Sequence, residues 1–258
     1  MIDGPRPALD LAALFTDAVA YELIGPDLEA GRDEGLWPEE EAQVARAVAA
    51  RRVQFAAGRR CARAGLVALG LAAGPIPTGP HRAPCWPDGT TGSISHTTGY
   101  AVAVVRRTGA GAPGAVPADT GEPEAPENDP ISIGVDAEQL GRVGDHLYSR
   151  LFTPAEEAWL ARLPGARRDA AATAVFGAKE AFYKAQFPLT GAWVGFHDVR
   201  SHPVENPDGT HAGYRLEPHT RLAALHAVEW PCVARHVQRG AVVVSAVELL
   251  AAPRRRGL

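Results

Sequence analysis

The sequence has few cysteines, no apolar run long enough to cross a bilayer and no excess of basic residues. Cys61, Cys85 and Cys232 are odd in number, lie far apart and lack CxxC spacing, which argues against a disulfide framework and against a zinc site. The N-terminus lacks the basic start and the apolar stretch of a secretion signal. These absences predict reduced thiols, no membrane partner and a cytoplasmic location.

A Walker A sequence and a GxGxxG motif are also missing, so we do not expect a P-loop or Rossmann protein. The net charge of -4 argues against general nucleic-acid binding, yet positive charge is concentrated between Arg51 and Pro87. That stretch has no Asp or Glu and six arginines: Arg51, Arg52, Arg59, Arg60, Arg63 and Arg82. It is either a solvated basic face or a site for a ligand with several phosphates, whose oxygens arginine binds two at a time.

Helical and strand patterns alternate along the first half of the chain. Residues 37–71 predict one or two helices that begin at Pro38 with three glutamates, with Gly58 as a possible break. Residues 91–105 predict a strand, a turn and a strand, because serine, glycine and β-branched residues precede an alternating apolar run. Residues 108–130 are rich in Gly, Pro, Ala and acid without a hydrophobic period, which predicts a mobile loop.

The second half repeats this mixture. Residues 131–138 predict a short strand, and a helix is expected after Thr153 as N-cap, followed by a second helix that Pro188 stops. Two strands joined at Gly240 come next, and the last residues read as a frayed end. We therefore expect an α+β fold of two similar lobes, residues 1–130 and 131–258.

Acidic residues are the first candidates for chemistry. Asp136 and Glu138 project from the same face of the predicted strand, where two carboxylates repel each other unless a hard cation such as Mg²⁺ offsets their charge. Glu180 and Lys184 follow Phe176 at helical spacing, so an acid and a base share one face. The alternatives are a solvated strand end and a surface ion pair.

Ser95 and His96 end the strand of the GSISH segment. A single histidine is more often a structural hydrogen-bonding group than a ligand, and that alternative stays open. A serine hydrolase lacks support, because histidine stands where a Gly-x-Ser-x-Gly elbow needs its second glycine.

Four sequence blocks occur in the order and approximate spacing of the 4′-phosphopantetheinyl transferases: RRVQFAAGRRCARAGL, RAPCWPDGTTGSISH, IGVDAE and FGAKEAFYKAQFPLTGAWVGFHDV. The chain most resembles the two-lobed bacterial type that serves siderophore, polyketide and nonribosomal peptide synthases. The resemblance implies two lobes in a pseudo-twofold arrangement with the active site at their interface. It also implies Mg²⁺-dependent transfer of the phosphopantetheine arm of coenzyme A to a carrier-protein serine, releasing adenosine 3′,5′-bisphosphate.

The resemblance assigns roles around the acids. Asp136 and Glu180 are implied as metal ligands, with Glu138 as a third ligand or a group just behind them, and Mn²⁺ suits the same oxygens. Glu180 also resembles the general base, acting directly or through water. Lys184 is implied to steady the transferring phosphate, with help from Lys179.

The resemblance assigns the coenzyme grip to the first lobe. Ser95 and His96 resemble the pair that contacts the coenzyme phosphates, and the basic positions that hold the adenosine bisphosphate end are Arg51, Arg59 and Arg82. The alignment could shift by one residue, which would put Arg52 in the place of Arg51. His81 could likewise take the role of Arg82. The implied partners are acyl or peptidyl carrier proteins of polyketide, nonribosomal peptide or fatty acid synthases, docked on the arginine-rich surface or an apolar strip beside the second lobe. We expect a monomer.

Two rival functions stay open at this point. A metal-dependent nuclease could use Asp136, Glu138 and Glu180, although Lys179 and Glu180 are adjacent in a helical pattern and the chain is acidic. A non-catalytic module that binds coenzyme or docks carriers could dispense with Glu180 and Lys184, yet both are present.

Overall fold

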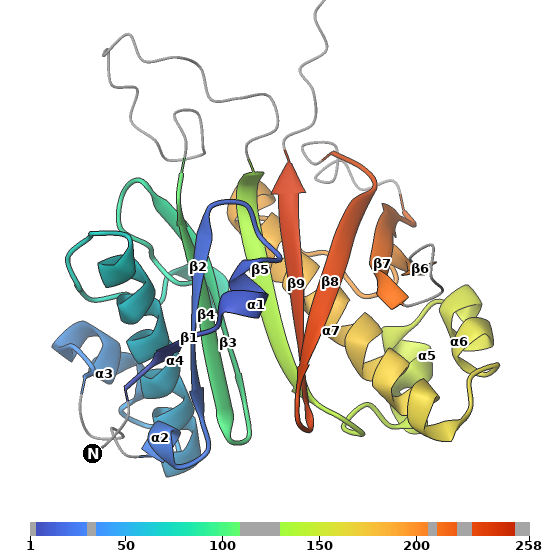
Figure 1. Ribbon diagram of the computed structural model, residues 1–258, viewed down its shortest axis with the longest axis horizontal. Coiled ribbons are helices and arrows are strands. Elements are labelled where there is room, and N and C mark those ends of the chain that lie inside the picture. Colours follow the sequence, from blue (N-terminus) through green and yellow to red (C-terminus); the bar gives the residue numbers. More distant parts are fainter. Residues whose placement is uncertain (1–3, 30–34, 109–129, 206–210, 221–228, 251–258) are drawn as a thin grey trace, which may run out of the picture.

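A computed structural model describes residues 4–29, 35–108, 130–205, 211–220 and 229–250. It contains two antiparallel sheets, each covered by one long helix (Figure 1). The α+β class predicted from the sequence is confirmed. No helix in these ranges has the length and apolar character that spanning a membrane requires.

The first sheet has the strand order β1-β2-β4-β3 and is covered by the helix α4. Its strands are β1 (Arg6–Pro7), β2 (Ala18–Ile24), β3 (Thr90–Thr97) and β4 (Tyr100–Arg107). The helices of this lobe are α1 (Leu9–Ala12), α2 (Pro26–Glu29), α3 (Pro38–Val44), α4 (Ala49–Ala68) and the 3₁₀ turn Pro80–Arg82. The strand-turn-strand predicted at 91–105 is confirmed as β3 and β4.

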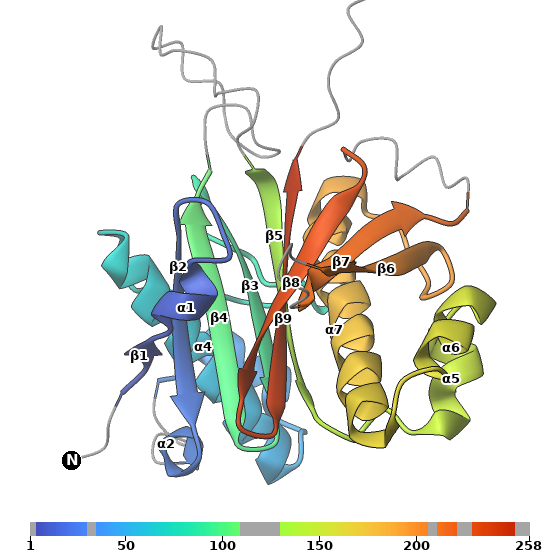
Figure 2. The ribbon, with the colours of Figure 1, turned by 45° about the vertical axis from the view of Figure 1, so that its right-hand side comes forward.

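The second sheet has the order β5-β9-β8-β7-β6 and packs on the helix α7 (Figure 2). Its strands are β5 (Pro130–Gln139), β6 (Val199–Glu205), β7 (His211–Pro218), β8 (Cys232–Arg239) and β9 (Val242–Leu250). The helices are the 3₁₀ turn Asp145–Leu147, α5 (Tyr148–Leu151), α6 (Pro154–Leu160) and α7 (Gly165–Thr190). Thr153 caps α6 as predicted, and the β8–β9 turn lies at Gly240.

Two helix boundaries differ from the predicted ones. Gly58 does not break a helix: it lies inside α4, where a Cβ would stand 2.7 Å from the Ile94 side chain of β3. The break lies instead between Val44 and Ala49. Pro188 does not end α7, which continues to Thr190 and stops at Gly191 in the left-handed region.

The two lobes share a continuous apolar core. Val102 and Val104 of β4 pack in one cluster with Val135 of β5 and Val244 of β9, and Leu11 of α1 joins them. Because this core crosses from one sheet to the other, both lobes form one packed body. The boundary at 130/131 stays a prediction, since most of the predicted loop 108–130 and the frayed C-terminal end lie outside the described residues.

Serine hydroxyls connect β3 to β5, which belong to different sheets. Ser93 Oγ accepts the N–H of Val135 at 3.0 Å, and Ser95 Oγ accepts the N–H of Ala137 at 3.1 Å. Side chains thus satisfy backbone donors that a neighbouring strand would otherwise satisfy. The seam between the lobes is therefore held by directed hydrogen bonds as well as by apolar contacts.

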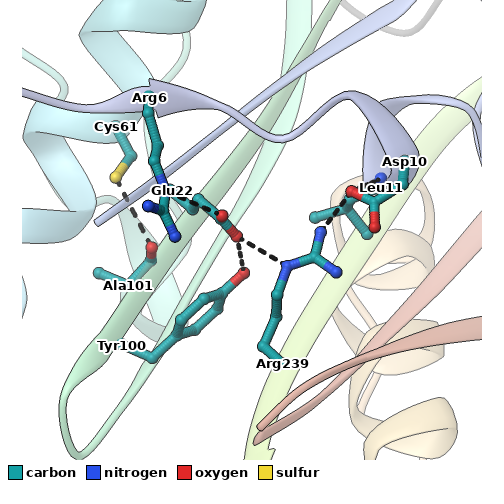
Figure 3. Close-up of polar contacts among 8 residues, drawn as sticks. All are labelled: Arg6, Asp10, Leu11, Glu22, Cys61, Tyr100, Ala101 and Arg239. Carbon is teal, nitrogen blue, oxygen red and sulfur yellow. Dashed lines mark hydrogen bonds and ion pairs between the residues drawn. The ribbon is translucent and has the colours of Figure 1, made fainter. Parts of the chain in front are cut away.

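A buried carboxylate also links the lobes (Figure 3). Glu22 of β2 accepts a hydrogen bond from the Tyr100 hydroxyl at 2.6 Å and pairs with Arg239 of β8 at 3.2 Å. Arg6 pairs with its other oxygen at 3.2 Å, and Arg239 also reaches Asp10. Because removing one partner of a buried ion pair leaves an uncompensated charge, this cluster favours a single arrangement of the two lobes.

Candidate active site

A cleft of about 1030 Å³ opens between the lobes. One wall comes from the first lobe, through α4, the segment 78–86 and β3, and the other comes from α7. The lining residues that carry charge or an imidazole ring are Arg51, Arg59, His81, Arg82, His96, Glu180 and Lys184. The cleft therefore places a basic wall opposite a helix that carries an acid and a lysine.

Asp136 lies at the centre of the seam and is only 4% exposed. Its Oδ1 accepts hydrogen bonds from Ser95 Oγ at 3.0 Å and from Lys184 Nζ at 2.7 Å. Its Oδ2 is buried without a hydrogen-bond partner among the described residues. A buried carboxylate oxygen in that state costs free energy, so it is suited to a ligand that supplies positive charge.

Two further carboxylates lie close enough to Asp136 to feel its charge. Burial, together with the charges of Asp136 and Glu180, raises the pKa of Glu138 to about 7. Burial also raises the pKa of Glu180, and the charge of Asp136 adds to that shift. Glu138 Oε2, like Asp136 Oδ2, is buried and has no partner within the described ranges. Negative charge therefore accumulates here beyond what Lys184 neutralises.

Lys184 holds the two lobes together at this point. Its ammonium donates to Ser95 Oγ at 3.0 Å, to the Val135 carbonyl at 3.1 Å and to Asp136 Oδ1 at 2.7 Å. These three acceptors match the three protons of the ammonium group. Because 28% of the side chain remains exposed, the ammonium also borders the cleft.

The basic wall opposite α7 holds several positive groups without carboxylate partners. Neither Arg51 nor Arg82 forms an ion pair with a carboxylate within the described ranges, and their mutual repulsion adds to burial in lowering the pKa of Arg51. Arg51 Nη1 contacts His96 Nε2. Burial, Arg51 and Lys184 lower the pKa of His96 to about 4, so its ring is neutral at pH 7. An anion placed in the cleft would relieve this repulsion.

Arg59 is the most deeply buried arginine of this wall, at 5% exposure. Its Nε donates to the Ile76 carbonyl at 2.7 Å and its Nη2 to Thr78 Oγ1 at 3.1 Å, while the guanidinium lies 4.2 Å from the Phe55 ring centre. Burial lowers the pKa of Arg59 to about 10, and Arg51 and Arg63 contribute to the lowering. The neighbours hold this cation rigidly but do not cancel its charge.

Backbone strain accompanies the basic wall. His81 and Arg82 have φ values of 52° and 66°, in the left-handed region that residues other than glycine seldom adopt. The His81 ring contacts Phe187 of α7 at a centre distance of 5.0 Å, so the strained turn closes one end of the cleft against the other lobe. Such conformations persist where the surroundings enforce them, which is typical of ligand-binding segments.

Comparison with known proteins decides the family. Residues 39–106 match the 4′-phosphopantetheinyl transferase N-terminal domain, and residues 132–238 match the 4′-phosphopantetheinyl transferase superfamily. The 4′-phosphopantetheinyl transferase Svp of Streptomyces mobaraensis is 39% identical over 71% of this chain and 67% of its own length. The chain belongs to the 4′-phosphopantetheinyl transferase superfamily.

Further members of the superfamily agree. The 4′-phosphopantetheinyl transferase PptT of Mycobacterium tuberculosis is 40% identical over 63% of this chain and 63% of the relative. The alignment with the 4′-phosphopantetheinyl transferase Npt of Nocardia iowensis, at 34% identity, spans 67% of this chain and 68% of the relative. A holo-(acyl-carrier-protein) synthase from Bacillus anthracis aligns with 48% of this chain and 98% of its own, with 22% identity and a TM-score of 0.37, a likeness too slight to define a shared function.

Most of the residues that the transferase resemblance singled out come together around the cleft. The lining residues among them are Arg51, Arg59, Arg82, His96, Glu180 and Lys184. Asp136 lies behind Lys184, which contacts it directly. Their individual roles stay predictions. Two other arginines of the basic stretch, Arg52 and Arg63, pair with Glu41 and Glu40 of α3.

Ser95 and Lys179 are placed differently from what the transferase resemblance implies. Ser95 is 5% exposed and does not line the cleft; its hydroxyl is occupied by Ala137, Asp136 and Lys184. Lys179 points away from the cleft and into the second lobe, where it pairs with Glu156 at 2.7 Å. Neither side chain offers a free donor to the coenzyme in this arrangement.

The aromatic lining of the transferase cleft was missed in the sequence. The rings of Tyr183 and Phe187 on α7 pack against each other at a tilt, with their centres 5.7 Å apart, and Trp86 lines the opposite wall with Phe55. The spacing of Tyr183 and Phe187 at i and i+4 is a signal for one helix face. It could not show whether that face meets the core or a ligand.

Proposed function

We propose that this chain transfers the 4′-phosphopantetheine arm of coenzyme A to a serine hydroxyl of an apo carrier protein. The observation that carries this proposal is the arrangement of the cleft, in which cations of the first lobe that have no carboxylate partner among the described residues face Glu180 and Lys184 of the second. A coenzyme with a 3′-phosphate and a diphosphate supplies the negative charge that the basic wall lacks. Membership of the superfamily supplies the reaction class.

In this proposal the first lobe binds the coenzyme, and the second lobe supplies the groups that take part in the reaction. Arg51, Arg82 and His96 hold the phosphates of the adenosine end, and Arg59 stiffens the wall behind them. Glu180 accepts the proton of the incoming serine hydroxyl while the serine oxygen bonds to the pantetheine-side phosphorus of the diphosphate. The bridging P–O bond breaks, and its electron pair leaves with adenosine 3′,5′-bisphosphate. Lys184 neutralises charge on the transferring phosphate.

The acidic residues fit a divalent cation. Asp136 Oδ2 and Glu138 Oε2 are buried oxygens without partners among the described residues, and Glu180 lies near enough for repulsion. No group of three or more His, Cys, Asp or Glu side chains in the described part of the chain is arranged to hold a metal. The proposal rests on the two buried oxygens without partners in the described ranges: Asp136 is the first ligand, and Glu138 and Glu180 would complete the set when a cation binds. Mg²⁺, or Mn²⁺, would neutralise charge on the diphosphate when bound.

The proposed partners are acyl or peptidyl carrier proteins of polyketide, nonribosomal peptide or fatty acid synthases. Siderophore synthases are included, and these substrates accord with a cytoplasmic enzyme. Both walls of the cleft belong to one chain, which supports a monomer as the active form.

The test is to incubate the protein with Mg²⁺, coenzyme A and a panel of apo carrier proteins and to measure their intact masses. Each accepted carrier should gain one phosphopantetheine, and the same amount of adenosine 3′,5′-bisphosphate should appear. The matched control is each carrier with its acceptor serine changed to alanine, which should gain nothing. Failure to modify any carrier in a panel that covers all three synthase classes would contradict the proposal.

A further inference from the structure

Lys179 and Lys184 are the only lysines of the chain, whose other basic side chains are arginines and histidines. Both lie on α7, five residues apart. Successive residues of a helix point about 100° apart, so Lys179 and its neighbour Glu180 face different surroundings. Glu180 and Lys184 line the cleft, while Lys179 is 4% exposed and points into the second lobe.

The surroundings of Lys179 consist of three acceptors. Its ammonium donates to Glu156 Oε2 at 2.7 Å, to the Phe196 carbonyl at 2.7 Å and to the Leu151 carbonyl at 3.2 Å. An ammonium has three protons, and all three are used. The planar fork of an arginine does not match three converging acceptors, which explains a lysine in a chain rich in arginine.

Glu156 is equally occupied. Its Oε1 accepts the N–H of Ser201 at 2.6 Å, and its Oε2 accepts the N–H and the hydroxyl of Thr153 at 2.7 and 2.9 Å in addition to Lys179. Glu156 is 2% exposed and Thr153 is fully buried. A buried ion pair is tolerated when its remaining hydrogen-bonding groups are satisfied, as they are here.

This network joins four further segments of the second lobe to Lys179 of α7. Leu151 ends α5, Thr153 and Glu156 begin α6, Ser201 lies in β6 and Phe196 belongs to the segment between α7 and β6. Lys179 and Glu180 both line a second, smaller cavity of about 110 Å³ with Phe196. Fixing the Lys179 ammonium therefore fixes the rotation of α7 about its axis at the residue before Glu180.

We propose that Lys179 is a positioning residue, which acts through Glu156 to hold Glu180 and Lys184 toward the cleft and does not touch the coenzyme. The effect on turnover rests on the proposed function, whereas the placement of Lys179 does not. Two classes of measurement therefore separate the two ideas, one of them independent of activity.

The activity-independent measurement is labelling of lysines with an amine-reactive reagent, read by mass spectrometry of peptides. In the native protein Lys184 should react and Lys179 should not, because their side chains are 28% and 3% exposed. Saturating coenzyme A should protect Lys184 and leave Lys179 unchanged. Labelling of Lys179 that coenzyme A suppresses would overturn the proposal.

The second measurement compares Glu156→Gln, Lys179→Met and the double variant. All three should lower kcat at least 10-fold with an unchanged Kd for coenzyme A, and the double variant should be no worse than the single ones. Glu156→Gln should also make Lys179 reactive to the label. A raised Kd for coenzyme A in folded Lys179→Met, or wild-type kcat in Glu156→Gln, would contradict a positioning role.

A milder variant guards against loss of folding. Thr153→Val removes the hydrogen bond from the hydroxyl to the Glu156 carboxylate and the cap that accepts the Glu156 N–H, and it keeps the shape of the side chain. It should increase labelling of Lys179 and lower kcat by a smaller factor, again without a change in coenzyme binding. Unchanged labelling together with unchanged kcat in folded Thr153→Val would argue against the network. If the wild-type protein transfers nothing, the labelling pattern still decides where Lys179 points.

Discussion

The hydroxyl of Ser95 in the first lobe donates to the Asp136 carboxylate of the second at 3.0 Å, and the same hydroxyl accepts from Lys184. One small side chain thus connects β3 to an acid on β5 and a base on α7. Sequence similarity implies a coenzyme contact for Ser95, whereas the structure makes it the point where both lobes and both charges meet.

Ser95→Ala should therefore impair turnover more than coenzyme binding. The variant leaves the Ala137 N–H and one Lys184 proton without their acceptor, at a cost of about 1–3 kcal/mol in the free energy of unfolding. We expect kcat to fall and the KM for coenzyme A to change little. Ser95→Thr, which keeps the hydroxyl, is the control. An increase in the KM for coenzyme A with an unchanged kcat would instead indicate that Ser95 contacts the coenzyme.

Arg51 and Arg52 form a matched pair of neighbours on α4. Arg51 lines the cleft beside His96, whereas Arg52 pairs with Glu41 at 3.0 Å on the side of α3. Since a charge-assisted hydrogen bond contributes about 1.5–3 kcal/mol, Arg51→Gln should raise the KM for coenzyme A by about 10-fold or more. Arg52→Gln should leave it unchanged. Steady-state kinetics on both variants decides which arginine binds phosphate, and the reverse result would show the one-residue slip.

Gly134 allows α7 to approach β5. A Cβ at this position would overlap the carbonyl oxygen of Ala181 on α7. Gly134→Ala should lower the free energy of unfolding by at least about 1–3 kcal/mol and should reduce kcat, because the helix that carries Glu180 must move away from Asp136. Gly74→Ala is the control, since nothing lies within 4 Å of a Cβ there. Urea unfolding that gives equal midpoints for both variants would contradict the close approach.

The elements with strong local signals were predictable from the sequence. Thr153 with Glu156 makes a capping box whose chemistry is local, and Gly99 separates two strands in a turn of positive φ. The continuation of α4 through Gly58 could not be predicted, because the close Ile94 side chain of β3 is what requires a glycine there, whereas the end of α7 had a local signal in Gly191.

The residue types of the site could be predicted from the sequence, but the directions in which their side chains point could not. A helical pattern places Lys179 and Lys184 on different faces, yet only the packing of α7 shows that one meets Glu156 and the other Asp136. The stretch from Arg51 to Pro87 contains no acid. Glutamates just upstream nevertheless neutralise part of its positive charge, since Glu40 pairs with Arg63. Charge counted in a window of sequence therefore overestimates the free positive charge of the folded surface.

His96 should make stability depend on pH. Its pKa is about 6.5 when unfolded and about 4 in the structure, where burial, Arg51 and Arg59 on α4 and Lys184 on α7 disfavour the charged ring. The unfolded state therefore binds the proton first, so the contribution of neutral His96 is present above pH 6.5 and is lost as the pH falls toward 4. Relative to His96→Gln, the wild type should lose about 1–3 kcal/mol over this window in urea unfolding. Parallel pH profiles would contradict this.

In the proposed function, the second lobe supplies the reacting groups while the first lobe holds the coenzyme. The decisive variant is Glu180→Gln. An apo carrier is incubated with Mg²⁺, coenzyme A and the enzyme, and its intact mass is measured. Binding of coenzyme A to the same enzyme is measured by calorimetry. We predict that the wild type modifies the carrier, and that Glu180→Gln leaves the carrier unmodified over the same time while it still binds coenzyme A. Modification by Glu180→Gln at the wild-type rate would contradict the account.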